Sequence, residues 1–115
     1  MVLWIGFDLQ AEIEAGDDSN WTALHYAAGF GKEAVAAQLL QAGAIVSAVD
    51  DGGQKPLHWA ADNGKSSIAN LLLQANASPT AVDKDGDTPA QYAKQHANGD
   101  LAARLLEAEQ AAALN

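Results

Sequence analysis

The sequence predicts an all-α solenoid, in which helix-turn-helix units stack on one another and are joined by β-turn or hairpin loops. The main observation is an eight-residue pattern that recurs with a constant spacing of 33 residues, at residues 21–28, 54–61 and 87–94. An Ala-x-x-x-Ala pattern recurs with the same spacing, at residues 11–15, 44–48 and 77–81. A constant period of about 20–50 residues is typical of repeat proteins, where each unit buries its apolar face only by stacking on its neighbour.

Residues 1–16 are predicted to form a partial unit that begins inside a second helix. Phe7 stands one period before Leu40 and two periods before Leu73. The apolar run at residues 2–7 is unusual, because the end of a stack normally presents a polar face to water. We therefore expect this run to fold back as a cap or to be covered by upstream sequence or a partner. A short strand is the competing interpretation.

The first full unit, residues 17–49, begins with a turn rich in Asp, Ser and Asn. Asn20 occupies the position that Gly53 and Gly86 hold one and two periods later. Glycine and asparagine share the ability to adopt a positive φ, so this position is predicted to be left-handed in all three turns.

Two helices follow this turn. Thr22 is predicted to cap a helix that runs to about Phe30, because a threonine hydroxyl can accept a free backbone N–H at a helix start. Gly31 is predicted to break this helix. Residues 32–41 then form the second helix, which Gly43 ends in the left-handed conformation.

The second unit, residues 50–82, repeats this plan. Pro56 suits the first turn of a helix, where its missing N–H has no cost. Lys55 precedes it where the first unit has a threonine, so the second unit lacks the hydroxyl cap. Gly64 breaks the helix, and Asn76 replaces glycine as the left-handed residue after the second helix.

The third unit, residues 83–115, departs from the plan. Its helix breaker shifts to Asn98 and Gly99, which predicts a longer first helix. Residues 107–115 are polar and rich in alanine. Because terminal repeats are atypical, we interpret this segment as the C-terminal cap.

The repeated pattern has a recognisable core built on the pair Leu-His. A Thr or a Pro stands shortly before this pair, and an aromatic residue and Ala follow it. It reads Thr22-Ala23-Leu24-His25-Tyr26-Ala27 in the first unit and Lys55-Pro56-Leu57-His58-Trp59-Ala60 in the second. This core and the 33-residue period resemble the ankyrin repeat family over nearly the whole chain. The resemblance implies units made of a β-turn and two antiparallel helices. It also implies a non-catalytic module that binds a partner protein on its concave face, formed by turn tips and first helices.

Composition and charge narrow the functional classes. The chain has 115 residues, a net charge of −9 and no basic stripe, so phosphate-directed binding to nucleic acid and binding to anionic membranes are not expected. Residues 1–7 lack the basic region and the long apolar stretch of a signal peptide. The absence of cysteine excludes disulfides and is consistent with a cytoplasmic location.

Two residue patterns suggest metal sites, and neither is complete. His25 and His58 share one repeat position, but the third unit has Gln91 there, so no third ligand completes a zinc site. The resemblance implies instead that these imidazoles bond to backbone across the turn. Residues 83–94 faintly resemble a calcium loop, but the glycine and glutamate positions do not match. No metal, cofactor or catalytic constellation is expected.

Seven aspartates lie in the three turns. Three of them share one repeat position and are interpreted as structural, because aspartate favours turns: Asp17, Asp50 and Asp83. Four others occupy variable positions, which face the ligand in ankyrin proteins: Asp18, Asp51, Asp85 and Asp87.

Aromatic residues provide the second indication of a binding face. Tyr26, Trp59 and Tyr92 share one position and predict an aromatic ladder, with partial burial between helices as the alternative. Trp and Tyr are favoured anchors at protein interfaces. The predicted partner-binding residues are Trp21, Tyr26, Phe30, Asp51, Gln54, Trp59, Asp62, Asn63, Asp85, Asp87, Tyr92 and Gln95.

These residues suit a partner protein with a basic or mixed basic and apolar surface, bound by a monomer. The alternative is that the stack serves as a structural or regulatory fragment or subunit of a larger enzyme or complex. The apolar run at residues 2–7 motivates this alternative.

Overall fold

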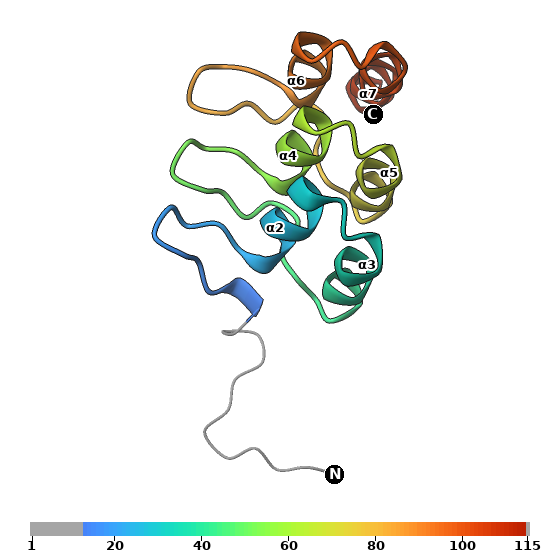
Figure 1. Ribbon diagram of the computed structural model, residues 1–115. Helices are drawn as coiled ribbons and strands as arrows, with labels where there is room; N and C mark the ends of the chain where they lie inside the picture. Colours follow the sequence, from blue (N-terminus) through green and yellow to red (C-terminus); the bar gives the residue numbers. More distant parts are fainter. Residues whose placement is uncertain (1–12, 115) are drawn as a thin grey trace, which may run out of the picture.

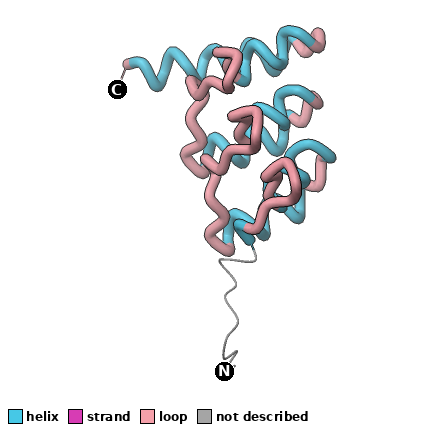
Figure 2. The backbone as a smooth tube through the Cα atoms, turned by 90° about the vertical axis from the view of Figure 1, so that its left-hand side faces the viewer, coloured by secondary structure: helices cyan, strands magenta, loops and turns pink. Residues whose placement is uncertain are grey.

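The computed structural model describes residues 13–114, and within them the predicted all-α solenoid is confirmed. The labelled helices are α2 (Ala23–Phe30), α3 (Glu33–Gln41), α4 (Pro56–Asp62), α5 (Ser66–Gln74), α6 (Pro89–Gln95) and α7 (Gly99–Ala113). Helices α2, α4 and α6 stack in one column, α3, α5 and α7 in a second, and the turn loops project to one side (Figure 1). Figure 2 shows only helices and loops along this part of the chain, with no strand.

The core lies between the two columns and between successive units. Leu24 and Leu57, at equivalent positions, are each 1% exposed. Alanines at the contacts between first helices let the backbones approach closely, and those buried there are Ala27, Ala28, Ala60, Ala61 and Ala93. Ile68, Leu72 and Leu105 are contributed by the second helices. Because every unit contributes to the same core, no unit has a separate hydrophobic centre.

The helix starts confirm the predicted threonine caps. The Thr22 hydroxyl accepts from the His25 N–H at 3.4 Å, and the Thr88 hydroxyl accepts from the Gln91 N–H at 3.3 Å. In return, His25 Nδ1 accepts from the Thr22 N–H at 3.1 Å. At α4 only this return bond exists, from the Lys55 N–H to His58 Nδ1 at 3.0 Å, because a lysine side chain cannot accept.

The three turns have the predicted backbone conformation. The shared position has φ of 63° at Asn20, 75° at Gly53 and 82° at Gly86. The turns are also bonded to one another, since the Asp51 N–H donates to the Ser19 carbonyl and the Lys84 N–H donates to the Gly52 carbonyl, each at 3.0 Å. The loop tips therefore form a connected row along the stack.

One helix prediction is wrong. We expected the first helix of the third unit to extend towards Asn98 and Gly99, but α6 ends at Gln95. Ala97 occupies the position of the helix-breaking glycines and adopts a φ of 60°, against 71° at Gly31. The packing of the second helix on the first requires the same bend in each unit, and in the third unit the packing of α7 on α6 holds Ala97 in this conformation although alanine disfavours it.

The two ends of the stack differ. Helix α7 has 15 residues against nine in α3 and α5, and it extends beyond the stack (Figure 2). It buries Leu101, Ala102 and Leu105 against the other helices. At the other end, Ile13 is 7% exposed, and the Glu14 carboxylate accepts from the Ile45 N–H at 2.8 Å. The predicted fold of residues 2–7 lies outside the described residues.

Candidate functional site

The two histidines brace the turns, as the resemblance implied. His25 Nε2 lies 2.9 Å from the Gln54 carbonyl, and His58 Nε2 lies 3.0 Å from the Asp87 carbonyl. Since Nδ1 of each ring accepts a backbone N–H, Nε2 carries the proton and donates to the following unit. Burial lowers the pKa of both imidazoles, although the Nε2 hydrogen bonds and nearby aspartates oppose it. Each neutral ring thus links two consecutive units.

The aspartates that share one position also have a structural role. The Oδ1 atom of each accepts two backbone N–H groups of its own turn, as in Asp50, which accepts from Gly52 at 3.0 Å and Gln54 at 2.8 Å. The Oδ2 atom accepts from the aromatic residue nine positions later. The pairs are Tyr26 with Asp17, Trp59 with Asp50 and Tyr92 with Asp83.

These hydrogen bonds lower the pKa of the aspartates in the first and third turns, Asp17 and Asp83. The hydrogen bond from Tyr26 and those from the Trp21 and Ser19 amides lower the pKa of Asp17. Burial acts to raise the pKa of Asp83, but bonds from Tyr92 and two backbone amides outweigh it, so this pKa is also lowered. Both carboxylates are therefore charged near neutral pH.

An aromatic patch lies on the first two units, formed by Trp21, Tyr26, Phe30 and Trp59. The Trp21 ring is central, with centroid distances of 4.9 Å to Tyr26 and 4.5 Å to Trp59. Tyr26 and Phe30 stack almost in parallel, with centroids 6.0 Å apart and an interplanar angle of 7°. Tyr26 is 42% exposed and Phe30 is 64% exposed, whereas the two tryptophans are half-buried.

The patch does not continue onto the third unit. Tyr92, at the position of Tyr26 and Trp59, is only 8% exposed. Gln54 of the preceding unit contacts its hydroxyl at 2.8 Å, and His58 meets its ring edge-on at 5.0 Å. Two of the predicted site residues, Gln54 and Tyr92, therefore lie against each other and take part in packing between units.

The remaining predicted site residues surround the patch or lie beyond it. Asp51 is exposed and accepts from the Asn20 amide at 2.6 Å, so it also links two tips. Asp62 is paired with His96 of the next unit at 2.7 Å, and the Asn63 amide donates to the Trp59 carbonyl at 3.0 Å. Asp85 and Gln95 are exposed, and Asp87 is half-buried.

The acidic turn of the third unit brings oxygens of Asp83, Asp85 and Asp87 within 4.8 Å of one another. Both oxygens of Asp83 already accept hydrogen bonds, Oδ1 from the amides of the other two residues and Oδ2 from Tyr92. This geometry is that of a turn closed by an aspartate.

A comparison with models of protein families identifies the family of this chain. A family model described as "Ankyrin repeats (3 copies)" matches residues 3–83. The chain belongs to the ankyrin repeat family. No curated protein matches it. Ankyrin repeats are generally protein–protein interaction modules and are typically non-catalytic. No helix in residues 13–114 has both the length and the apolar content needed to cross a membrane.

The sequence reasoning missed two residues of this ankyrin surface. Gly29 stands where the later units have Asp62 and Gln95, and a Cβ there would already touch the Trp21 ring at 3.8 Å. That distance is an ordinary van der Waals contact, so the position lies directly beside the indole. A glycine at a position that is polar in the other units was the available signal. His96, paired with Asp62, could not be anticipated because its partner lies in another unit.

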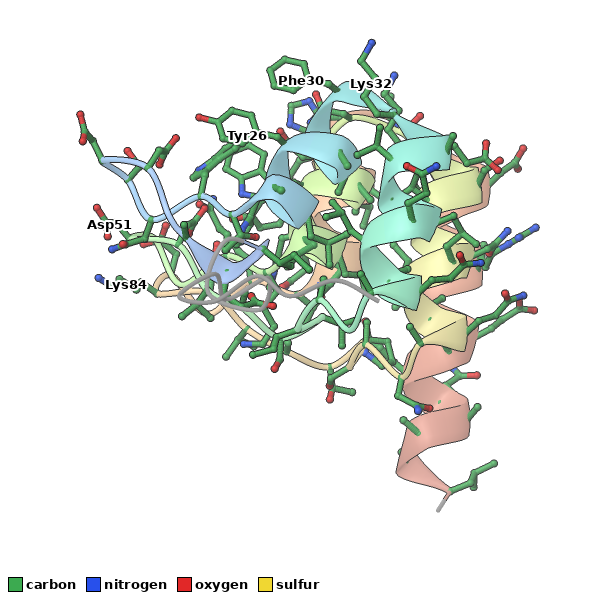
Figure 3. The ribbon with its side chains drawn as sticks, turned by 90° about the horizontal axis from the view of Figure 1, so that it is seen from below. Tyr26, Phe30, Lys32, Asp51 and Lys84 are labelled. Atoms are coloured by element: carbon green, nitrogen blue, oxygen red, sulfur yellow. The ribbon has the colours of Figure 1, made fainter. Side chains whose placement is uncertain are left out.

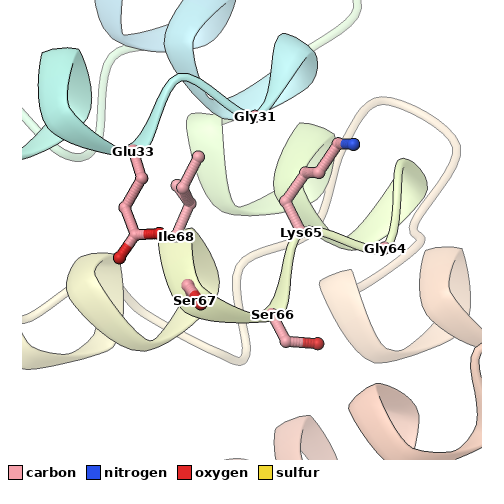
Figure 4. Close-up of a pocket in the computed structure, with 7 residues that line it drawn as sticks. All are labelled: Gly31, Glu33, Gly64, Lys65, Ser66, Ser67 and Ile68. Carbon is pink, nitrogen blue, oxygen red and sulfur yellow. The ribbon is translucent and has the colours of Figure 1, made fainter.

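A separate cleft of about 340 Å³ lies on the ankyrin stack between the starts of α3 and α5. It is lined by Gly31, Glu33, Gly64, Lys65, Ser66, Ser67 and Ile68 (Figure 4). The side chains of Glu33 and Lys65 lie apart, with the ammonium group of Lys65 directed away from the carboxylate. Since no polar groups converge in it, the aromatic patch is the stronger candidate site.

Proposed function

We propose that the chain is a non-catalytic module that binds a partner protein on the face formed by its loop tips and first helices. The observation that carries this proposal is the exposure of Tyr26 and Phe30 at the edge of the aromatic patch. Clustered aromatic residues at the surface are typical anchors of protein interfaces. The Tyr26 ring packs on the half-buried Trp21, and the Phe30 ring stacks on Tyr26, so the two exposed rings are supported from below.

The charge around the patch supports a basic or mixed basic and apolar partner. Asp18, Asp51 and Asp85 are exposed along the loop tips, and the chain has a net charge of −9. An acidic rim accelerates association with a basic partner and contributes less to the lifetime of the complex. Aromatic anchors act mainly on the dissociation rate, so the two groups of residues make separable contributions.

The test begins with capture of partners from a native lysate at low and high salt, followed by measurement of Kd for the protein identified. Phe30→Ala is the decisive variant, because the phenyl side chain makes no hydrogen bond that the substitution would remove. We expect it to raise Kd by at least about 30-fold, the effect of losing an anchor of about 2 kcal/mol. Asp18→Lys should mainly slow association and flatten its salt dependence.

The matched control is Gln38→Ala, an exposed position on α3 in the other helix column. It should leave Kd within about 2-fold of the parent, because exposed substitutions outside an interface have small effects. If Gln38→Ala weakens binding more than Phe30→Ala does, the partner uses the second helices and the proposed face is wrong.

A further inference from the structure

The outer edge of the aromatic patch forms a small cleft with an acidic wall. Asp17, Ser19, Trp21, Tyr26 and Phe30 line a space of about 310 Å³. The stacked rings of Tyr26 and Phe30 line this cleft together with the turn that carries Asp17, whose carboxylate accepts a hydrogen bond from the Tyr26 hydroxyl. Aromatic rings and the Asp17 carboxylate thus border the same space.

Both features of this cleft favour a cation. The face of an aromatic ring has a negative quadrupole, which attracts a cation within about 6 Å of its centroid. Asp17 is charged near neutral pH, as its hydrogen bonds indicate, and the neighbouring Asp18 is exposed. An uncharged apolar side chain would fill the same space only by taking water away from these carboxylates, which is unfavourable.

We propose that this cleft is the subsite for one arginine side chain of the partner protein, stacked on Tyr26 and Phe30 beside the Asp17–Asp18 turn. The inference rests on the proposed function and adds the chemistry of the bound residue. Arginine suits the cleft better than lysine, because the planar guanidinium stacks on aromatic rings and is less strongly hydrated than an ammonium group.

The charges on the far side of the cleft orient this arginine. Lys32 lies beyond Phe30, away from the tips that carry Asp51 (Figure 3). A Cβ added at Gly31 would lie 3.0 Å from the Lys65 side chain, so a second cation reaches the same end of α2. These two lysines repel a guanidinium from that end. The bound guanidinium is therefore directed towards the Asp17 turn, over the two rings, and away from the end of α2.

The test uses N-acetyl-arginine amide as the probe and N-acetyl-citrulline amide as its neutral control of nearly equal shape. Titrations of the whole chain are followed by NMR of the aromatic side chains. We expect saturable shifts at Tyr26 and Phe30 with the arginine probe, and at least about 5-fold weaker binding of the citrulline probe. Equal binding of the two probes, or no saturable shift, would overturn the assignment.

Matched variants separate this subsite from general attraction to an acidic protein. Phe30→Ala should weaken binding of the arginine probe by about 2- to 5-fold or more, and Asp18→Asn by about 2-fold. Asp100→Asn removes the same charge from an exposed position at the start of α7 and should leave binding unchanged. If Asp100→Asn weakens binding as much as Asp18→Asn, the probe is held by net charge alone and the subsite is refuted.

The outcome for this subsite is distinguishable from the outcome for the proposed function. If Phe30→Ala abolishes binding of the captured partner while the arginine and citrulline probes bind equally, the protein-binding face stands and the arginine subsite falls. If the arginine probe binds as expected but Phe30→Ala leaves partner binding intact, the cleft accepts a guanidinium that the partner does not supply. The inference is then wrong for the partner.

Discussion

Replacement of His58 provides a direct test of how the units are joined. The ring is fully buried, accepts from the Lys55 N–H at 3.0 Å and donates to the Asp87 carbonyl at 3.0 Å. His58→Ala leaves both backbone groups without this partner. His58→Gln can keep the first bond, because Gln91 at the equivalent position of the third unit accepts from the Thr88 N–H at 2.7 Å.

The two variants should therefore differ in a predictable order. An unsatisfied buried polar group costs about 1–3 kcal/mol. His58→Gln replaces the imidazole donor to Asp87 with a flexible amide N–H that is not held in the same position, and should lower the free energy of unfolding by at most about 1–3 kcal/mol. His58→Ala loses both bonds and the ring contact with Tyr92, so its loss should reach about 3–5 kcal/mol.

Urea denaturation followed by far-UV circular dichroism at about pH 7.5 measures both values. At this pH the imidazole is neutral in both the folded and unfolded states, so protonation does not contribute. Equal decreases in the free energy of unfolding for the two variants would show that the hydrogen bond from the Lys55 N–H makes no net contribution to stability. Losses within about 0.5 kcal/mol of the parent would refute the role of His58 as the link between units.

Three further predictions concern stability. Because the pKa values of His25 and His58 are lowered in the folded chain, their contribution to stability is fully present above the unfolded value of 6.5 and falls as the pH drops below it. The free energies of unfolding from urea melts at about pH 7.5 and 5.5 should differ by at most about 1.4 kcal/mol per histidine. Ala97→Gly should raise the free energy of unfolding by about 0.5–1 kcal/mol, since it relieves a left-handed alanine, and an unchanged urea midpoint would contradict this. Leu57→Ala should lower the free energy of unfolding by about 2–5 kcal/mol and make unfolding less cooperative. An unchanged thermal melt would show that Leu57 does not contribute to the shared core.

Most of the fold could be predicted because the repeat constrains each position in several copies. The buried leucines, the threonine caps and the left-handed turn residues each recur at a fixed spacing, and the structure places them as expected. The end of α6 could not be predicted from local signals. Asn98 and Gly99 are better helix breakers than Ala97, but the stacking of α7 decides where the chain bends.

The surface was harder to predict because equivalent residues meet different neighbours. Tyr26, Trp59 and Tyr92 share one repeat position and the same aspartate contact, yet their exposure differs. The ring of Trp59 is covered by Trp21 of the preceding unit, and Tyr92 is covered by Gln54. Periodicity predicts which position a residue occupies, whereas its accessibility depends on the side chain one unit earlier.

The two histidine bonds between units run in the same direction along the stack, from each unit to the next. A middle unit receives a histidine N–H from the unit before it and sends one to the unit after it. The third unit receives such a bond but has Gln91 where the first two units have the histidine donor. A duplicated copy of residues 50–82 thus finds both of its partners when it is inserted between the second and third units, but meets Gln91 in place of a histidine when it follows the third unit. Lengthening of the array by duplication therefore preserves the chain of histidine bonds only where the copy follows a unit that carries a histidine at this position.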